Sequence, residues 1–294
     1  MISYLYFKYI SGKKIIKKLN DSKKIDFNNN IAVAISTDST FLKQTKIFIR
    51  SLENALMKVN LYILNVSLKE LELEEIIQSS PANVDVMVIN INDERLDNLK
   101  VSKKWPVEAW ARILIPELID EDVVLYLDVD CVVTNELTSI IQIVDSEFYI
   151  GGVKSPYYIK NKVNGIYLNK AINSGVMIMN LSKLREFEFT EKILEFADNY
   201  NDKLVMPDQD AINYVCRDIM ENIDPKFNVM NFFFSSSFSE LKSKYGEVIY
   251  NKELYEYSKN NPSIIHFNGG PFKRPWQKGI LKHPYSKLYE HYNK

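Results

Sequence analysis

Residues 124–134 read VLYLDVDCVVT, a run of apolar, strand-forming residues into which Asp128 and Asp130 are set. An unpaired carboxylate inside a sheet costs on the order of several kcal/mol, so a partner must compensate both side chains. Residues two apart in an extended chain point to the same face, and the two carboxylates can therefore reach one cation. The stretch predicts a buried strand that ends in a ligand site, with a helix cap or a salt bridge as the alternative partner.

Two further Asp-x-Asp triplets have the same spacing in a different context. Asp120 and Asp122 separate a helix-like segment from a strand-like one, which predicts an exposed turn. Asp208 and Asp210 follow Pro207, a residue that favours the first turn of a helix, so Asp208 can simply cap that helix. Only the triplet in VLYLDVDCVVT is set between apolar, strand-forming residues.

Strand-like and helix-like segments alternate along the rest of the chain. Such alternation predicts an α/β fold whose sheet is covered by helices on both faces and is mostly parallel at its start. Strands are expected at 31–36, 60–66, 84–90, 123–128, 148–153 and 174–180, and helices at 41–56, 68–77, 106–119, 191–200 and 208–220.

Composition excludes several classes of protein. The 294 residues carry 37 Lys and Arg against 38 Asp and Glu, a balance that argues against a nucleic-acid binder. The 2 cysteines form no disulfide framework, and no apolar run is long enough to span a bilayer, which together favour a cytoplasmic protein. With 9 glycines the chain contains no glycine-rich phosphate loop, so dinucleotide-binding and P-loop folds are not expected.

Residues 1–28 form a basic segment with interleaved aromatic residues. We expect either a helix, solvated or packed on the main domain, or a peripheral anchor that binds an anionic membrane surface. After residue 229 the chain becomes rich in aromatic residues and serine, which indicates an appended C-terminal segment.

Four stretches in this order resemble a known family: LYLDVDCVV (125–133), NSGVMIMNL (173–181), PDQDAIN (207–213) and IIHFNGGPFKRPW (264–276). They resemble the retaining nucleotide-sugar glycosyltransferases of family 8, and most of all the bacterial lipopolysaccharide glucosyl- and galactosyltransferases. The resemblance implies a GT-A fold, a mixed central sheet flanked by helices with a small C-terminal segment. It also implies a division into the N-terminal segment 1–28, a nucleotide-sugar-binding catalytic domain 29–228 and an acceptor-side segment 229–294 that completes the metal site.

The same resemblance implies a metal site. Asp128, Asp130 and His266 would bind Mn²⁺ or Mg²⁺, the cations that suit oxygen ligands with one imidazole. A lone histidine is otherwise more often a satisfied polar residue. Val129 would also lie at the donor site. Contacts to the donor diphosphate would come from Gly269 and Gly270 and from Lys273 or Arg274, between which the sequence does not decide.

The resemblance places the donor nucleoside at the end of the first strand, where Asp38 would accept from the uracil imide and Ser36, Thr37 and Thr40 would lie near the base and ribose. Taken alone, this polar cluster is a helix N-cap signal. On the sugar side, Asn173 and Ser174 would face the donor. Catalytic roles there are implied for Asn173, Arg112, Asp208 and Gln209, although Arg112 can equally make a structural ion pair.

Together these expectations describe a metal-dependent retaining enzyme that moves glucose or galactose from a UDP-sugar to a glycan or lipid-linked glycan of the bacterial surface, with lipopolysaccharide as one example. Its expected location is the cytoplasm, with contact to the inner face of the membrane if the basic segment is an anchor. The alternatives are a metal-dependent nucleotidyltransferase or phosphoesterase, and a catalytically inactive sugar-nucleotide-binding protein.

Overall fold

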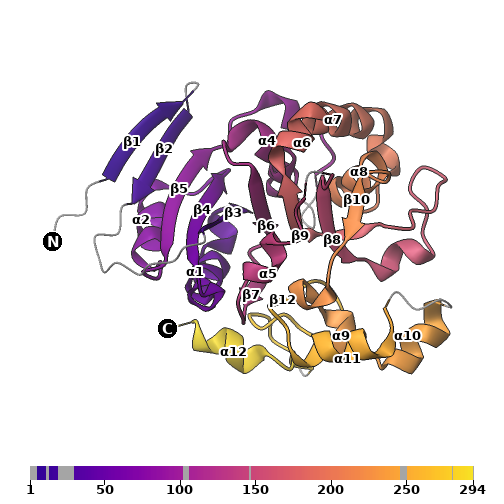
Figure 1. Ribbon diagram of the computed structural model, residues 1–294. Coiled ribbons are helices and arrows are strands. Elements are labelled where there is room, and N and C mark those ends of the chain that lie inside the picture. The colour runs from indigo at the N-terminus through magenta and orange to yellow at the C-terminus, as the bar shows by residue number, and fades with distance from the viewer. Residues whose placement is uncertain are drawn as a thin grey trace.

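The computed structural model describes residues 30–101, 106–145, 147–245, 250–279 and 281–293, and the backbone of residues 5–10 and 13–18. Its largest element is a nine-stranded sheet in the order β1-β2-β5-β4-β3-β6-β9-β8-β10 (Figure 1). Strands β5, β4, β3 and β6 are parallel, and β9 runs antiparallel to both β6 and β8. The sheet strands are β1 (Leu5–Ile10), β2 (Lys13–Lys18), β3 (Asn30–Thr37), β4 (Lys58–Asn65), β5 (Val84–Asn90), β6 (Val123–Leu127), β8 (Ile150–Lys154), β9 (Ile172–Asn180) and β10 (Met220–Asn222).

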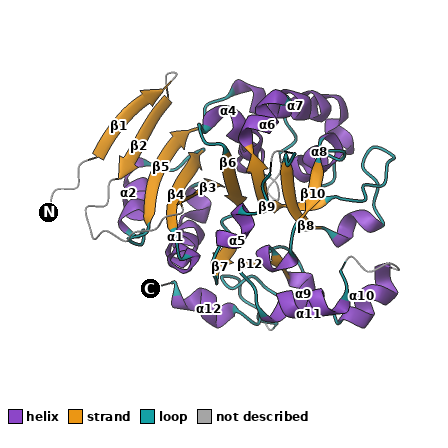
Figure 2. Cartoon of the chain, in the orientation of Figure 1, coloured by secondary structure: helices purple, strands orange, loops and turns teal. Residues whose placement is uncertain are grey.

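Helices cover both faces of this sheet, as the sequence predicts (Figure 2). One core contains side chains of α1, α2 and α5, and the other contains side chains of α3, α4, α6, α7 and α8. The helices are α1 (Leu42–Ser51), α2 (Glu70–Gln78), α3 (Val107–Ala111), α4 (Ile115–Leu118), α5 (Thr138–Ile141), α6 (Leu181–Glu186), α7 (Phe189–Tyr200), α8 (Pro207–Val215), α9 (Asn231–Ser235), α10 (Phe238–Tyr245), α11 (Lys252–Asn260) and α12 (Ser286–His291).

Strand β3 explains how the two cores are kept apart. Ile31, Val33 and Ile35 pack into the first core, whereas Ala32 and Ala34 pack into the second. Alternate residues of a strand point to opposite faces, so a strand buried on both sides is apolar throughout. The small alanines leave room for the helices of the second core to approach the sheet.

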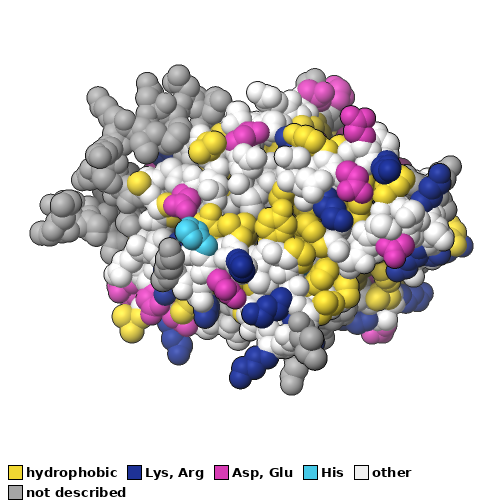
Figure 3. Space-filling model, turned by 90° about the horizontal axis from the view of Figure 1, so that it is seen from below, with side chains coloured by type: hydrophobic (Ala, Val, Ile, Leu, Met, Phe, Trp, Pro, Cys, Tyr) yellow, Lys and Arg dark blue, Asp and Glu magenta, His cyan; other side chains and the backbone are white. Residues whose placement is uncertain are grey.

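A second, three-stranded sheet joins the C-terminal segment to the centre of the molecule. Strand β12 (Ile264–His266) lies between β11 (Val229–Met230) and β7 (Cys131–Val133), which directly follows Asp130. In Figure 1 this C-terminal segment, in orange to yellow, lies along the lower side of the molecule. Seen from below (Figure 3), apolar side chains form a band across the middle of the molecule, with Lys and Arg side chains nearby. Among the described residues, no helix is long and apolar enough to cross a membrane.

The expected strands are confirmed, but several expected helices differ in their limits. The helix expected over 208–220 ends at Val215, and Met220 begins strand β10. The helix expected over 41–56 is α1 followed by a 3-10 turn over Leu52–Ala55. The helix expected over 106–119 is divided into α3, a 3-10 turn over Arg112–Leu114 and α4. Pro116 accounts for the second boundary, because it lacks an N–H donor and favours the first turn of a new helix.

The helix expected in the N-terminal segment is wrong for residues 5–10 and 13–18. Strands β1 and β2 pair in antiparallel orientation, and β2 extends the sheet by pairing with β5. The runs LYFKYI and KKIIKK contain aromatic and β-branched residues, which favour strands. The membrane-anchor alternative concerns side chains of residues 1–28, which lie outside the described residues, and the limits of the three domains stay a prediction.

A leucine pair tests the position of the core. Leu61 on β4 is fully buried, whereas Leu71 on α2 is 73 % exposed. Leu61→Ala is expected to lower the free energy of unfolding by about 2–5 kcal/mol, because it removes buried methyl groups and leaves a cavity. Leu71→Ala should change it by less than about 0.5 kcal/mol. Urea denaturation of the two variants measures the difference, and equal effects would contradict the described packing.

Candidate active site

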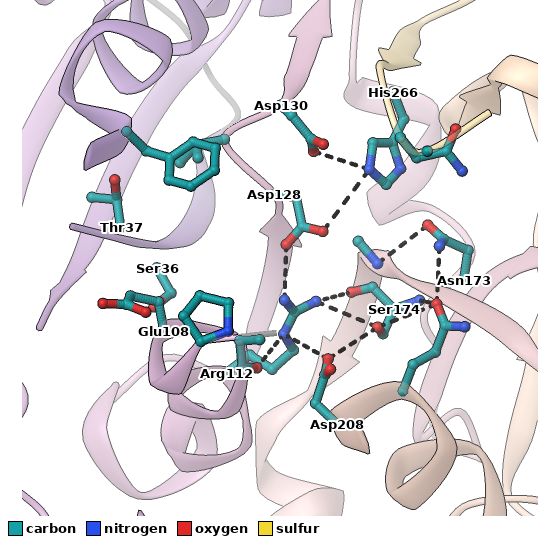
Figure 4. A pocket seen from close by; sticks show the side chains of 18 of the residues that line it. Ser36, Thr37, Glu108, Arg112, Asp128, Asp130, Asn173, Ser174, Asp208 and His266 are labelled. Carbon is teal, nitrogen blue, oxygen red and sulfur yellow. Dashed lines mark hydrogen bonds and ion pairs between the residues drawn. The ribbon is translucent and has the colours of Figure 1, made fainter. Parts of the chain in front are cut away.

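A cavity of about 530 Å³ opens where β3 and β6 end, on the side of the small sheet. Its walls come from β3, α3, β6, β9, α8, β12 and the loop after β12 (Figure 4). Most of the residues that the sequence singles out line it: Ser36, Thr37, Asp38, Arg112, Asp128, Val129, Asp130, Asn173, Ser174, Asp208, Gln209, His266, Gly269, Gly270 and Arg274. Thr40 and Lys273 do not. The other acidic triplet, Asp120 and Asp122, lies exposed in a turn, as expected.

Asp128, Asp130 and His266 converge at the upper part of this cavity in Figure 4. The His266 Nε2 atom lies 3.0 Å from Asp130 Oδ1 and 3.9 Å from Asp128 Oδ2. Strand pairing brings these distant positions together, because β12 is antiparallel to β7 with His266 opposite Cys131. The Phe267 N–H donates to the Asp130 carbonyl at 2.9 Å and extends the pairing beyond the strands.

This donor set fits a hard divalent cation. Adjacent ligands of an octahedral Mg²⁺ ion are about 2.9 Å apart, close to the distance between His266 Nε2 and Asp130 Oδ1. Gly175 keeps the space open, because a Cβ atom there would lie 2.4 Å from His266 Cε1 and 2.6 Å from Asp128 Oδ2. The Cys131 thiol also lies near this group. Burial raises the pKa of this thiol well above its ordinary value, and sulfur is a soft ligand that a hard divalent cation does not favour.

Arg274, rather than Lys273, reaches the acidic group. Burial alone would raise the pKa of Asp130, but interaction with His266 and then with Arg274 holds that pKa below its ordinary value. Arg274 Nη2 lies 3.3 Å from Asp130 Oδ2, and its Nε donates to the Phe267 carbonyl. Lys273 is exposed and packs against Gly279 instead. Of the two adjacent basic residues, the second is therefore the one whose side chain reaches the site.

Arg112 is a buried cation held between acidic and carbonyl groups. Its Nη2 lies 3.0 Å from Asp128 Oδ1, its Nε lies 3.4 Å from Asp208 Oδ2, and its Nη1 donates to the Ser174 carbonyl at 2.8 Å. The guanidinium also stacks over Tyr126, 4.6 Å from the ring centre. Burial opposes the charge, but Asp128 and the other acidic groups raise its pKa above the ordinary value. Arg112 thus makes the structural ion pair and lines the cavity at once.

Asp208 lies beside Arg112 in the first turn of α8, where Met206 rather than Asp208 holds the N-cap position. Burial raises the pKa of the Asp208 carboxyl to about 6, and the opposing effect of Arg112 is too small to restore the ordinary value. The Ser174 hydroxyl lies 3.4 Å from Asp208 Oδ2.

Side-chain amides connect His266 to Asn173 and Gln209. His266 Nδ1 lies 3.0 Å from Asn228 Oδ1, and Asn228 Nδ2 donates to Asn173 Oδ1 at 2.9 Å. Asn173 Nδ2 then donates to Gln209 Oε1 at 2.9 Å, and Gln209 Nε2 donates to the Tyr158 hydroxyl at 3.1 Å. The Tyr158 hydroxyl in turn donates to Asp210 at 2.6 Å.

At the end of β3, the helix-cap interpretation of Asp38 is observed. Its carboxylate accepts from the Phe41 N–H at 3.0 Å and from the Thr40 hydroxyl at 2.7 and 2.9 Å. Thr40 is exposed and is not among the residues that line the cavity. The Thr37 hydroxyl is bonded to Thr45 at 2.7 Å, whereas the Ser36 hydroxyl is buried and has no hydrogen-bond partner among the described residues.

Sequence reasoning missed four cavity or supporting residues. Tyr126 donates to Asp128 Oδ1 at 2.8 Å, and its position two residues before Asp128 on the same strand could have indicated this contact. Asn228 and Tyr158 connect elements that are far apart in sequence, and no local pattern marks them. Glu108 lines the cavity four residues before Arg112, on the same face of the helical segment.

Comparison with known structures defines the class of fold. The galactosyltransferase LgtC, solved with donor and acceptor sugar analogues, superimposes with a TM-score of 0.75 at 18 % identity, over 90 % of this chain and 95 % of that one. The chain therefore has the GT-A fold of glycosyltransferases, as the sequence predicts.

Sequence comparison then gives the family. The model of glycosyl transferase family 8 matches residues 32–279, and the chain belongs to that family. General stress protein A of Bacillus subtilis is 26 % identical over 247 residues, 80 % of this chain and 82 % of that protein. The lipopolysaccharide 1,2-glucosyltransferase of Escherichia coli is 23 % identical over 276 residues, 90 % of this chain and 78 % of that enzyme.

The pKa of Asp208 predicts a pH effect on stability. An unfolded carboxyl has a pKa of about 3.9, and the folded value is about 6. The folded state holds the proton more tightly, so stability is lost as the pH rises from about 4 to about 6. Relative to wild type, Asp208→Asn should therefore gain roughly 3 kcal/mol in the free energy of unfolding between pH 4 and pH 7.

Urea denaturation with EDTA at a series of pH values measures this gain. Asp120→Asn, at an exposed position, is the control and should show no such trend. A difference between Asp208→Asn and wild type that stays constant with pH would contradict the assigned burial of the charge.

Proposed function

We propose that the protein is a metal-dependent retaining hexosyltransferase that moves glucose or galactose from a UDP-sugar to a glycan acceptor of the bacterial surface. The observation that carries the proposal is one cavity in which Asp128, Asp130 and His266 lie beside the sugar-side residues Asn173 and Gln209. Membership of family 8 supports transfer of a sugar rather than of a nucleotide or phosphate.

The proposed reaction breaks the bond between the anomeric carbon and the donor diphosphate, and the bond electrons leave with the phosphate oxygen. A divalent cation bound by Asp128, Asp130 and His266 would supply positive charge to that leaving group. Arg274, at 3.3 Å from Asp130, is a second positive charge on the same wall and can bind the diphosphate directly. Arg112 is fully engaged with Asp128, Asp208 and Ser174, so its main role is to hold these residues in position.

On the sugar side, retention of configuration requires the acceptor oxygen to arrive on the face that the diphosphate leaves. A double displacement needs a carboxylate nucleophile on the opposite face. Gln209 presents an amide instead. Asp208 is ion-paired with Arg112, and its raised pKa means that it binds a proton more tightly than a free carboxylate does. We therefore favour a front-face route, in which the acceptor hydroxyl gives its proton to the departing phosphate oxygen and Gln209 stabilises the oxocarbenium-like state.

The donor and acceptor classes are proposed from the relatives. LgtC is named as a galactosyltransferase and was solved with donor and acceptor sugar analogues, and the Escherichia coli relative is named as a lipopolysaccharide 1,2-glucosyltransferase. These names support glucose or galactose as the transferred sugar and a glycan or lipid-linked glycan as the acceptor. The segment 229–294 is proposed to face that acceptor, in the cytoplasm or at the inner surface of the membrane.

Activity with UDP-glucose and UDP-galactose tests the metal site. Asp130→Ala removes a carboxylate from the donor set, and we expect turnover in Mn²⁺ to fall on the order of 10³-fold, because charge on the leaving diphosphate loses its stabilisation. Release of UDP, measured with and without EDTA, reports both the hydrolysis and the transfer of the sugar. Wild-type enzyme in EDTA should resemble the variant.

Asp120→Ala provides the matched control, since Asp120 belongs to an Asp-x-Asp triplet but lies in an exposed turn. It should keep wild-type turnover. Full activity of the wild type in EDTA would rule out the metal-dependent mechanism, whereas tight UDP binding without any turnover would identify an inactive sugar-nucleotide-binding protein.

Gln209→Ala tests the sugar side separately. Loss of the amide should lower kcat about 10²-fold, the usual cost of removing one group that stabilises charge in the transition state, with a smaller effect on KM. Gln78→Ala, at an exposed position of α2, should have no effect. Steady-state kinetics with the better UDP-hexose distinguishes the two variants, and an unchanged kcat in Gln209→Ala would exclude a role in catalysis.

A further inference from the structure

Glu108 is an unsatisfied acceptor in the wall of the cavity. Its Oε2 atom is buried and has no hydrogen-bond partner among the described residues, although the side chain lines the cavity. Figure 4 places Glu108 on the side of Ser36 and Thr37, across the cavity from Asp130 and His266. Buried polar atoms without a partner are rare in folded proteins, so this one indicates a group that arrives with a ligand.

Ser36 gives independent support for a ligand on the same side. Its side chain is 7 % exposed and lines the cavity, and its hydroxyl also has no partner among the described residues. Among the described residues, no group of β3 or α3 makes a hydrogen bond to the Glu108 Oε2 atom or to the Ser36 hydroxyl. Two unsatisfied polar groups from different elements therefore line the same cavity, and Figure 4 draws them on the same side of it.

Asp38, the residue that the family resemblance assigns to the nucleobase, differs from Glu108 because its carboxylate already has hydrogen-bond partners. Its carboxylate already accepts from the Thr40 hydroxyl and the Phe41 N–H as a helix cap. Glu108 is free of such a task at Oε2. Burial, and then the charge of Asp38, raise the pKa of Glu108 above its ordinary value, which is consistent with two acidic groups that lie near each other.

The charges of the cavity orient a nucleotide with respect to Glu108. Arg274 and the cation-binding group lie on one side, and they suit the diphosphate. The acidic side chains of Asp38 and Glu108 would repel a phosphate and instead accept hydrogen bonds from N–H or O–H groups. On a nucleoside such donors are the imide of the base and the ribose hydroxyls.

We propose that Glu108, with Ser36 beside it, accepts a hydrogen bond from the nucleoside of the donor and helps to select that nucleoside. The inference rests on the proposed function, because it takes the bound nucleotide to be a UDP-sugar. It adds Glu108 of α3, as a residue that selects the nucleoside, to the residues at the C-terminal end of β3.

Binding measurements on Glu108→Ala and Glu108→Gln test this role. In Mn²⁺, isothermal titration calorimetry should give a Kd for UDP about tenfold weaker in Glu108→Ala than in wild type, the usual loss for one hydrogen bond to a charged group. Binding of inorganic pyrophosphate should be unchanged. Glu108→Gln keeps a carbonyl acceptor and should recover part of the affinity for UDP. Glu191→Ala, an exposed glutamate in the first turn of α7, is the control and should bind UDP as wild type does.

Nucleotide analogues identify the donor group. If Glu108 accepts from the imide, Glu108→Ala and wild type should bind N3-methyl-UDP equally; if it accepts from the ribose, they should bind 2′-deoxy-UDP or 3′-deoxy-UDP equally. Equal UDP affinity of Glu108→Ala and wild type, or an equal loss for UDP and pyrophosphate, would overturn the role of Glu108.

The failure of the proposed function has a different signature. Wild-type protein would then bind ADP, GDP or CDP more tightly than UDP, and the comparison of Glu108→Ala with wild type is made with that nucleotide. Wild-type protein that binds none of the four would overturn both proposals. Thermal denaturation of each variant confirms that the fold is kept.

Discussion

The ion pair between Arg112 and Asp128 is the constraint on which the site depends. The guanidinium is buried, and it connects the segment after α3 to the end of β6, to Ser174 on β9 and to Asp208 on α8. A buried charge without partners is far more costly than the same charge in a complete network, so each of these elements has one favourable position relative to the others. The break between α3 and α4 belongs to this arrangement, because it places Arg112 in a 3-10 turn beside the sheet rather than within one long helix.

The position of Asp128, Asp130 and His266 depends on a second connection, between the two sheets. Strand β6 ends at Leu127, and the chain turns through Asp128 and Asp130 into β7, which pairs with β12. This turn takes the chain from the nine-stranded sheet to the small one, so the carboxylates lie at the junction of the two. Gly175 on β9 leaves the space into which Asp128 and His266 project. The C-terminal segment is therefore part of the site itself, since β12 supplies the imidazole.

The sequence predicts much of this arrangement, for reasons that can be stated residue by residue. Residues 31–35 are all apolar, the pattern of a strand that is covered on both faces. Separately, the four motifs that resemble the family contain most of the cavity residues that the sequence singles out. Contacts between distant side chains are another matter. No residue near Asn228 in the chain indicates that its side chain will contact His266. The polar residues around Asp38 predict a helix N-cap and a nucleoside contact equally well, so the local sequence does not distinguish the two roles. The choice of Arg274 over Lys273 depends on how a loop turns, which residue types alone do not fix.

The amide chain explains why His266 presents one particular nitrogen to the carboxylates. Asp210 can only accept, so the Tyr158 hydroxyl donates to it and must accept from Gln209 Nε2. The backbone N–H of Ser174 fixes the same orientation of the Gln209 amide, since it donates to Oε1 at 3.0 Å. The orientation of the Gln209 amide fixes that of the Asn173 amide, which fixes that of the Asn228 amide. The side-chain oxygen Oδ1 of Asn228 therefore faces His266 Nδ1, which must carry a proton in order to donate. Nε2 then faces Asp130 Oδ1 at 3.0 Å, a distance at which two acceptors repel unless a proton or a cation lies with them. With its proton on Nδ1, the imidazole presents the lone pair of Nε2 to a divalent metal, so the hydrogen bonds that run from Asp210 to Asn228 orient the metal-facing nitrogen of His266.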